Sequence, residues 1–429
     1  MRIVALTPET RKDLLSNLLK RSPNQYGQYE ETVKDIIEQV KQCGDDVLLE
    51  LAHRFDHNEI TKETLKVTEA EIEEAVQEVG PELYAVMEKS AANIRAFHEL
   101  QKRNSFITTS EDGSVLGQRI TPLEKVGVYV PGGKAAYPSS TLMTVIPAKV
   151  AGVSRIVMTS PAGPDGKVNA GTLAAARIAG VDEIYKTGGA QAIAALAFGT
   201  QQIPRVDKIV GPGNIFVALA KKAVFGYVSI DSIAGPSEIL VLADEKANPR
   251  YAAADLLSQA EHDELASAIL ITTSSELARR VSDEVDGFLQ KLERREIIEK
   301  SLENYGYILV ADDMDQAIEA ANEIASEHLE LLVQNPYEVM PRIKNAGAIF
   351  MGEYSSEPLG DYFAGPNHVL PTNGTARFFS PLSVDDYIKK SSLISYSRSA
   401  LEAVHQDIEL FAEREGLTAH ANSIHVRFE

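Results

Sequence analysis

The strongest constraint on the fold is a repeated alternation of short β-rich runs with Ala-rich helical runs. Between residues 155 and 226 these runs are "RIVMTS", "AGTLAAARIAG", "EIYKTGG", "AQAIAALAFG", "DKIVGPG" and "NIFVALAKKAVFG". Such alternation is typical of a parallel sheet with helices on its faces. A second series, from "SEILVLAD" to "AGAIFMG", predicts a second α/β unit.

The remaining segments have other sequence patterns. Residues 1–103 carry apolar positions at helical spacing, as in "TVKDIIEQVKQCGDDVLLELAHRF", and residues 398–416 also read as helix. Residues 352–385 are rich in Gly, Pro, Ser and Asn, and irregular stretches this long are often functional. A chain of 429 residues exceeds one hydrophobic core, so several domains are expected.

Charge and cysteine content exclude several classes of protein. The formal net charge is −20, which argues against nucleic acid or an anionic membrane as the main partner. No run reaches the ~20 apolar residues of a membrane span, and no signal peptide is recognised, so a cytoplasmic protein is expected. Cys43 is the only cysteine, which excludes an intrachain disulfide, and its acidic neighbours disfavour a catalytic thiolate.

Two glycine-rich turns suggest phosphate binding without matching a full fingerprint. Gly211-x-Gly213 follows a predicted strand, but Phe216 stands where a dinucleotide fingerprint needs its third glycine. A simple tight turn explains these glycines equally well. In "GVYVPGGKAAYPSST", Val128 and Ala135 break the P-loop pattern around Lys134, although a glycine-rich turn that opens a helix can still bind an anion.

Candidate metal ligands are scattered along the chain. Gln259 and His262, in "LSQAEHDE", are three residues apart and share a helical face, whereas composition alone points to Glu261, His262 and Asp263. The strong zinc signatures are absent. Any metal site would gather ligands from distant segments, and for each candidate taken alone an ordinary surface or hydrogen-bonded role is favoured.

A candidate acid–base pair lies in "ASEHLEL". Glu327 precedes His328 at a predicted helix end, where both side chains can reach one cleft. A carboxylate and an imidazole commonly transfer protons near neutral pH. The dipeptide is common by chance, so it does not establish catalysis.

Taken together, several motifs resemble the histidinol dehydrogenase family. They occur in the family's order between Gly127 and Ile424, and the combination of "AGPSE" with "QAEH" is specific. The motifs are "GVYVPGGKAAYPSS", "TGGAQAIAALAFGT", "KIVGPGN", "IDSIAGPSEILVLAD", "LLSQAEHD", "SEHLEL", "GDYFAGPNHVLPT" and "EGLTAHANSI".

The resemblance implies an α/β architecture and an intertwined homodimer. It implies two incomplete Rossmann-like domains with parallel sheets, plus small helical N- and C-terminal extensions. The corresponding ranges are residues 1–26 for the N-terminal extension and 27–128 with 239–381 for a discontinuous domain holding zinc and catalytic residues. Residues 129–238 would bind NAD, and the helical tail 382–429 would reach the partner's active site.

The resemblance also implies the reaction and the residues that perform it. The expected activity is NAD-dependent oxidation of L-histidinol to L-histidine through histidinaldehyde, the last step of histidine biosynthesis, with one Zn²⁺ per subunit. The implied metal ligands, which also meet the substrate, are Gln259, His262, Asp361 and His420. The implied acid–base pair is Glu327 and His328, and His328 also contacts substrate. The remaining implied contacts are Ser237, His368 and Glu415 for substrate and Tyr129, Gln191 and Asn214 for NAD.

Residue chemistry fits this expectation. Zinc would act mainly as a template, since histidinol offers an imidazole and an amine. His328 would take the hydroxyl proton, and Glu327 would activate water for attack on the aldehyde, because the position of Cys43 disfavours a thiohemiacetal route. Two other classes stay open: a zinc hydrolase, and a non-catalytic amino-acid-binding protein with two α/β lobes.

Overall fold

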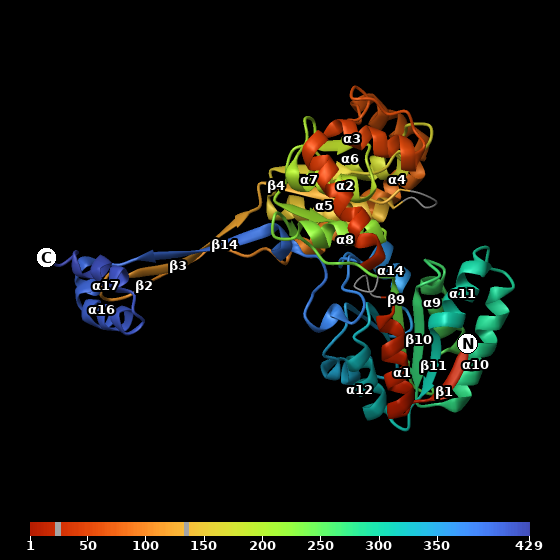
Figure 1. Ribbon diagram of the computed structural model, residues 1–429. Helices are drawn as coiled ribbons and strands as arrows, with labels where there is room; N and C mark the ends of the chain where they lie inside the picture. Colours follow the sequence, from red (N-terminus) through yellow and green to blue (C-terminus); the bar gives the residue numbers. More distant parts are fainter. Residues whose placement is uncertain (22–26, 133–136) are drawn as a thin grey trace. The chain divides into compact units, whose positions relative to one another are not determined.

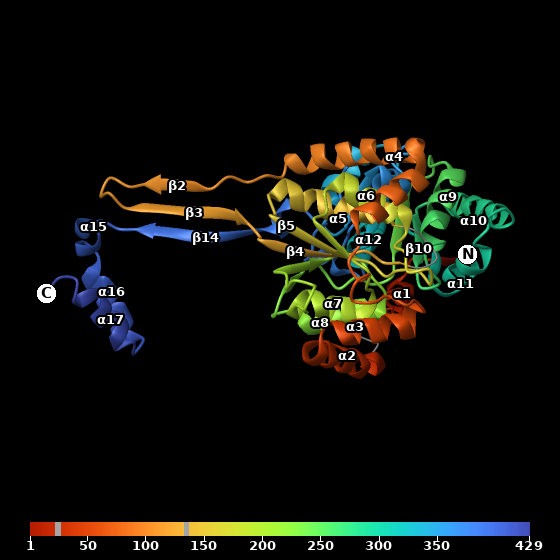
Figure 2. The same cartoon turned by 90° about the horizontal axis from the view of Figure 1, so that it is seen from above.

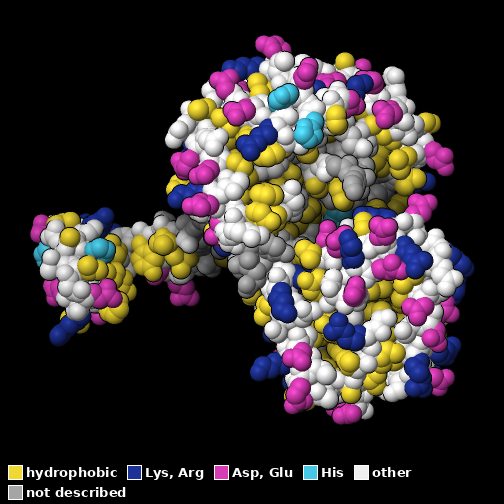
Figure 3. Space-filling view, turned by 45° about the vertical axis from the view of Figure 1, so that its right-hand side comes forward, with side chains coloured by type: hydrophobic (Ala, Val, Ile, Leu, Met, Phe, Trp, Pro, Cys, Tyr) yellow, Lys and Arg dark blue, Asp and Glu magenta, His cyan; other side chains and the backbone are white. Residues whose placement is uncertain are grey.

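The computed structural model describes residues 1–21, 27–132 and 137–429. These residues form two compact units, one of Met1–Gln101 with Leu123–Tyr387 and one of Lys102–Pro122 with Ile388–Glu429. The predicted anion-binding turn at Lys134 and the predicted boundary at residue 26 lie outside the described residues. Figure 3 shows basic and acidic side chains interspersed over one face of the molecule.

A five-stranded parallel sheet organises the first α/β module of the larger unit. Its order is β6-β5-β4-β7-β8. The strands are β4 (Lys125–Tyr129), β5 (Arg155–Thr159), β6 (Glu183–Tyr185), β7 (Lys208–Val210) and β8 (Ser229–Ile230). The central strands are buried on both faces, which explains their runs of Val and Ile.

Helices cover both faces of this sheet (Figure 2). On one side α5 and α6 pack with the long α4, and on the other side α7 and α8 pack with α2 and the neighbouring α3. Their bounds are α2 (Glu30–Cys43), α3 (Asp45–Leu51), α4 (Glu69–Glu99), α5 (Pro138–Ala151), α6 (Ala170–Ala179), α7 (Gly189–Phe198) and α8 (Ile215–Val224). A π-helical turn, Ala52–Asp56, follows α3.

A six-stranded parallel sheet organises the second module. Its order is β1-β11-β10-β9-β12-β13. The strands are β1 (Arg2–Ala5), β9 (Glu238–Ala243), β10 (Ser267–Thr272), β11 (Gly306–Val310), β12 (His328–Leu332) and β13 (Ala348–Met351). The two parallel sheets confirm the predicted α/β fold class.

Side-chain alternation divides the core of this sheet between two layers of helices (Figure 1). On β9, Ile239 and Val241 join the cluster under α9–α11, whereas Leu240 and Leu242 join the cluster under α1 and α12. The helices are α1 (Pro8–Leu19), α9 (Pro249–Ala260), α10 (Ser275–Leu289), α11 (Arg295–Tyr305) and α12 (Met314–Ile324). Two short helices, α13 (Pro336–Val339) and α14 (Glu357–Tyr362), follow β12 and β13 respectively.

The smaller unit is an antiparallel sheet followed by helices. Strand β3 (Val115–Pro122) lies between β2 (Phe106–Thr109) and β14 (Ile388–Ser395). Helices α15 (Arg398–Glu402), α16 (His405–Arg414) and α17 (Thr418–His425) complete it. The C-terminal helices are as predicted, but β14 was not predicted, because its exposed sequence "IKKSSLIS" lacks clear apolar alternation.

The packing of the N-terminal helices differs from the predicted domain assignment. Residues 27–128 were expected to accompany residues 239–381, yet α2 and α4 pack on the five-stranded sheet. The predicted N-terminal extension also contributes β1 to the edge of the six-stranded sheet. Both modules belong to one compact unit, so the division into domains stays a prediction. Among the described helices, none combines the length and apolarity required to span a bilayer.

Candidate functional site

The predicted acid–base pair lies at the amino end of the six-stranded sheet. His328 is the first residue of β12, and Glu327 directly precedes it, three positions after α12 ends at Ile324. The pair therefore begins a strand, whereas a helix end was expected. Strand pairing sets His328 opposite Ile239, which brings the pair beside Glu238, the first residue of β9.

The main chain of Glu238 holds both side chains of the pair. Its N–H donates to Glu327 Oε2 at 2.9 Å, and its carbonyl oxygen lies 3.0 Å from His328 Nδ1. Because a carbonyl oxygen only accepts, this contact places the imidazole proton on Nδ1. Nε2 of His328 is buried with no hydrogen-bond partner among the described residues, so its lone pair is available.

Burial changes the proton affinity of both groups. Desolvation raises the pKa of Glu327 well above its usual range, against the hydrogen bond from Glu238 N–H, which lowers it, and the nearby carboxyl groups of Glu238, Asp361 and Glu357 raise it further. Desolvation lowers the pKa of His328 to about 4, against a hydrogen bond to Glu238 that raises it. At neutral pH the imidazole is therefore uncharged and can accept a proton.

A candidate metal centre adjoins this pair. Ligand atoms of His262, Glu357 and Asp361 all lie within 4.8 Å of one another. Asp361 Oδ1 is also 3.9 Å from His328 Nε2. His262 follows the end of α9, whereas Glu357 and Asp361 are four residues apart on α14 and share one helical face.

Gln259 has the unsatisfied polar atoms expected of a ligand without its metal ion. It is fully buried near the end of α9, and neither Oε1 nor Nε2 has a hydrogen-bond partner in the described structure. The carbonyl oxygen of Gln259 also accepts from His262 N–H at 3.2 Å, which ties the two residues together. A buried amide left unpaired is costly, and a cation would satisfy its oxygen. The donor set therefore fits a divalent metal ion.

The carboxyl groups of this centre hold protons unusually well. Burial raises the pKa of Glu357 to about 8, with a further increase from Asp361, while Ser258 Oγ donates to Glu357 Oε2 at 2.9 Å. Burial also raises the pKa of Asp361 to about 6. Two acids at close range without a compensating cation favour protonation, and a bound divalent ion would reverse this preference.

His368 lies beside Asp361, whereas the other predicted substrate contacts are more dispersed. His368 Nδ1 is 3.1 Å from the carbonyl oxygen of Asp361, and its Nε2 is 3.4 Å from Ser140 Oγ. Ser237 directly precedes Glu238, and its carbonyl oxygen accepts from Ser267 N–H. Glu415 is the C-cap of α16 and His420 lies on α17, both within the smaller unit.

The three residues predicted to contact NAD line one cavity of about 980 Å³ in the first module. Tyr129 ends β4, Gln191 lies in the first turn of α7, and Asn214 caps α8, where its side chain accepts from Phe216 N–H and Val217 N–H. Gly211 has a φ of 115°, and a Cβ there would collide with the carbonyl oxygen of Tyr129. Two glycine-containing turns thus bring helix N-termini to this cavity, which suits a phosphate group.

Sequence reasoning missed two residues of the site. Glu357 could have been found from its spacing of four before Asp361 on a helix, had α14 been recognised. Glu238 acts through its main chain, and a main-chain contact cannot be predicted from a pattern of side chains. Cys43, as expected, is a free cysteine, and it is exposed.

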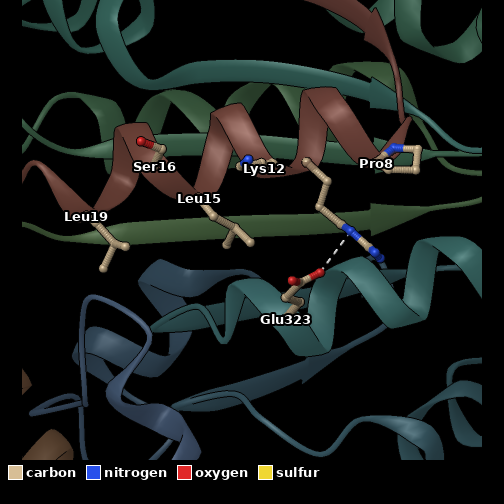
Figure 4. Close-up of a pocket in the computed structure, with 7 residues that line it drawn as sticks. Pro8, Lys12, Leu15, Ser16, Leu19 and Glu323 are labelled. Carbon is tan, nitrogen blue, oxygen red and sulfur yellow. Dashed lines mark ion pairs between the residues drawn. The ribbon is translucent and has the colours of Figure 1, made fainter.

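A second depression lies on α1 and lacks this chemistry. Its volume is about 370 Å³, and its charged lining consists of Arg11, Lys12 and Glu323. Lys12 and Glu323 are labelled in Figure 4. Arg11 Nε lies 2.9 Å from Glu323 Oε2 in a solvent-accessible ion pair. No candidate metal ligand set lines it, so the candidate site is the one at β9, β12 and α14.

Comparisons with known proteins agree with these observations. The family model for histidinol dehydrogenase matches residues 19–428. A histidinol dehydrogenase of Caldanaerobacter subterraneus subsp. tengcongensis is 56% identical over 422 residues, covering 98% of each chain. That of Aquifex aeolicus is 54% identical over 429 residues, covering 100% of this chain and 99% of the relative.

Solved structures give the same result at the level of the fold. The crystal structure of histidinol dehydrogenase from Elizabethkingia anophelis superimposes with a TM-score of 0.94 at 36% sequence identity. The match covers 100% of this chain and 98% of that one.

Proposed function

The chain belongs to the histidinol dehydrogenase family, and on that premise we propose that it oxidises L-histidinol to L-histidine through histidinaldehyde. NAD is the proposed acceptor and Zn²⁺ the proposed metal, one per subunit. The observation that carries the proposal is His328 Nε2, which is buried beside Asp361 of the metal-ligand group and has no hydrogen-bond partner in the part of the chain that the structure describes.

The proposed metal ligands come from two units of the chain. Gln259, His262 and Asp361 lie in the larger unit, and His420 of the smaller unit would supply the fourth, from the other subunit of a homodimer. When bound, zinc would hold the neutral imidazole and amine of histidinol as a template beside the nicotinamide. Glu357 adds a further carboxylate within reach of the same point.

His328 is the proposed base for the alcohol. Its Nδ1 proton is held by the Glu238 carbonyl, so only Nε2 can accept the proton of the substrate hydroxyl. Its lowered pKa keeps the imidazole uncharged before the reaction. Ser237, His368 and Glu415 are the proposed further contacts to histidinol.

Glu327 is the proposed base for the second half-reaction. It would take a proton from water as the water attacks the aldehyde, which forms the hydrate that is oxidised next. Burial raises its affinity for a proton, as a base requires, and the Glu238 N–H fixes one carboxylate oxygen. Cys43 is exposed, and its acidic neighbours in the sequence disfavour a thiolate, so a covalent thiohemiacetal is not part of the proposal.

The cavity lined by Tyr129, Gln191 and Asn214 is the proposed NAD site. Bound NAD would accept one hydride in each half-reaction. The size of this cavity favours a dehydrogenase over a zinc hydrolase, which needs no nicotinamide site. The buried pair of Glu327 and His328 favours an enzyme over a non-catalytic binding protein, which needs no acid–base pair. Stabilisation of the protein by NAD in a thermal-shift assay would argue against the zinc hydrolase. A cytoplasmic location stays a prediction.

The proposal is tested by measuring products and metal together. We expect histidinol-dependent NADH formation with two NADH per histidine, abolished by a chelator and restored by zinc. Retention of full activity in protein shown to be free of metal would contradict the metal assignment. Release of histidine without NADH would contradict the dehydrogenase assignment.

A further inference from the structure

We infer that Arg21, from the segment after α1, is a positioning residue that holds Glu327 and His328 in place through Glu238. This inference rests on the proposed function, because it assigns Glu327 and His328 as the reacting groups. Arg21 contacts neither of them. It would act by fixing Glu238, whose main chain contacts both.

Arg21 is inserted completely into the larger unit. Its side chain is 0% exposed, and Nη2 forms a buried ion pair with Glu238 Oε1. Nη1 donates to the carbonyl oxygen of Leu265 at 2.8 Å, and the guanidinium carbon lies 5.1 Å from the centre of the Tyr305 ring. These contacts come from three segments, so the guanidinium has a single defined position.

Glu238 connects this guanidinium to the reacting pair. Its side chain binds Arg21 through Oε1 and accepts from Asn373 N–H through Oε2 at 3.2 Å. Its main chain simultaneously donates to Glu327 and accepts from His328, as described above. Fixing the side chain of one residue therefore fixes the peptide groups that orient two others.

Glu238 lies at the start of β9, where it is already in register with Ser267 of β10. The pairing of β9 with β12 begins one residue later, at Ile239 opposite His328. The carbonyl of Glu238 is thus used by a side chain at the very end of the strand. Strand ends open more readily than strand centres, so an anchor on the Glu238 side chain would help to hold this peptide in place.

Removing Arg21 would leave the Glu238 carboxylate buried without its cation. Such a carboxylate must move toward water or take up a proton, and either response disturbs the end of β9. A buried ion pair by itself is weak evidence for added stability. The inference therefore concerns catalytic geometry, and a test must separate geometry from stability.

The experiment compares Arg21→Met, Glu238→Gln and the double variant, with zinc content, melting temperature and steady-state kinetics measured for each. For Arg21→Met we expect kcat for histidinol and for histidinaldehyde to fall roughly ten- to a hundredfold, with KM for NAD unchanged, since a displaced reacting group lowers the rate. The double variant should recover part of this kcat, because no unpaired carboxylate remains.

Arg11→Met is the matched control. Arg11 lies on α1, ten residues before Arg21, and makes a solvent-accessible ion pair instead of a buried one. We expect its kcat to equal that of the wild type. If Arg21→Met does not fold, Arg21→Lys keeps the charge but cannot make all contacts, and its kcat should fall while KM for NAD stays constant.

Several results would overturn the inference. One is a folded Arg21→Met variant that has a lower melting temperature but the same kcat as Arg11→Met. The same result for Arg21→Lys would count if Arg21→Met does not fold. Another is a loss explained by zinc content, or a double variant whose loss is the product of the single losses. If the wild type itself forms no NADH from histidinol, the proposed function fails instead, which is a distinguishable outcome.

Discussion

Glu327 is a buried carboxyl group with a defined hydrogen-bond donor and an adjacent imidazole. Its Oε2 receives the Glu238 N–H and lies 3.6 Å from His328 Nδ1. Because His328 Nδ1 is engaged with the Glu238 carbonyl and not with Glu327, the two side chains need not act on the same proton. This separation is consistent with one base for each half-reaction.

Replacing Glu327 by Gln therefore distinguishes the two steps. Glutamine has nearly the same shape but cannot take a proton from water, so oxidation of histidinaldehyde should fall by about 10²–10⁴-fold and alcohol oxidation by much less. Single-turnover measurements with each substrate check this prediction. Glu319→Gln, at an exposed position on α12, serves as the control. Equal losses in both half-reactions would remove the hydration role.

Site residues were predicted from the sequence mainly by resemblance. The spacing of Gln259 and His262 indicated a shared face, but composition favoured Glu261 and Asp263, and only the structure reveals the buried, unsatisfied amide of Gln259. Glu238 and Arg21 could not be predicted, because the contact between them joins segments 217 residues apart. Contacts between such distant segments depend on the topology of the fold and leave no pattern in the local sequence.

The helices and strands were predictable where their packing imposes a clear period. The alternating runs of residues 155–226 correspond to β5–β7 with α6–α8, because buried parallel strands need continuous apolar runs. Strand β14 was missed because its exposed sequence lacks apolar alternation and its pairing partner β3 is distant in the chain, and helix α14 was missed because it has only six residues. Local sequence carries little information about such elements.

Glu183 on β6 ties neighbouring segments of the first module together. Burial raises its pKa, but hydrogen bonds from Tyr185, Lys66 and Arg155 outweigh this and hold the pKa at about 2. These donors come from β6 itself, from the segment before α4 and from β5. The carboxylate thus stabilises the folded state only while it is ionised.

The stabilisation by Glu183 should depend on pH in a defined direction. Its folded-state pKa lies below the ordinary value of 4.5, so the contribution is complete above about pH 5 and declines as the pH falls toward 2. Because the site is partly accessible to solvent, we expect Glu183→Gln to lower the free energy of unfolding at pH 7 by only about 1 kcal/mol.

Urea unfolding at a series of pH values checks this prediction. The difference between wild type and Glu183→Gln should shrink as the pH falls below about 5. Glu88→Gln, at an exposed position on α4, controls for loss of a surface charge. A difference that stays constant from pH 7 to the acid limit of folding would contradict the ionised role.

At the scale of the whole molecule, the proposed site draws on both compact units. Gln259, His262 and Asp361 belong to the larger unit, and Glu415 and His420 to the smaller. The proposed homodimer would combine the larger unit of one subunit with the smaller unit of the other. An active site would then require two chains.

Complementation tests this arrangement directly. His262→Ala and His420→Ala should each be inactive, but an exchanged mixture forms hybrid dimers with one site free of either change. Random exchange should restore roughly a quarter of wild-type activity, since half of the dimers carry one intact site. Affinity tags of two kinds verify exchange. Absence of recovery in isolated hybrid dimers would rule out shared sites.

Strand β1 pairs with β11, roughly 300 residues farther along the chain, which has a consequence for synthesis on the ribosome. At about 5–20 residues per second, β1 and the following α1 must wait about 15–60 s for their partners to emerge. The five-stranded sheet is continuous in sequence and can be completed during this interval. The nascent chain therefore carries an unpaired strand past a finished module, and Arg21 reaches Glu238 only when the second module closes around it.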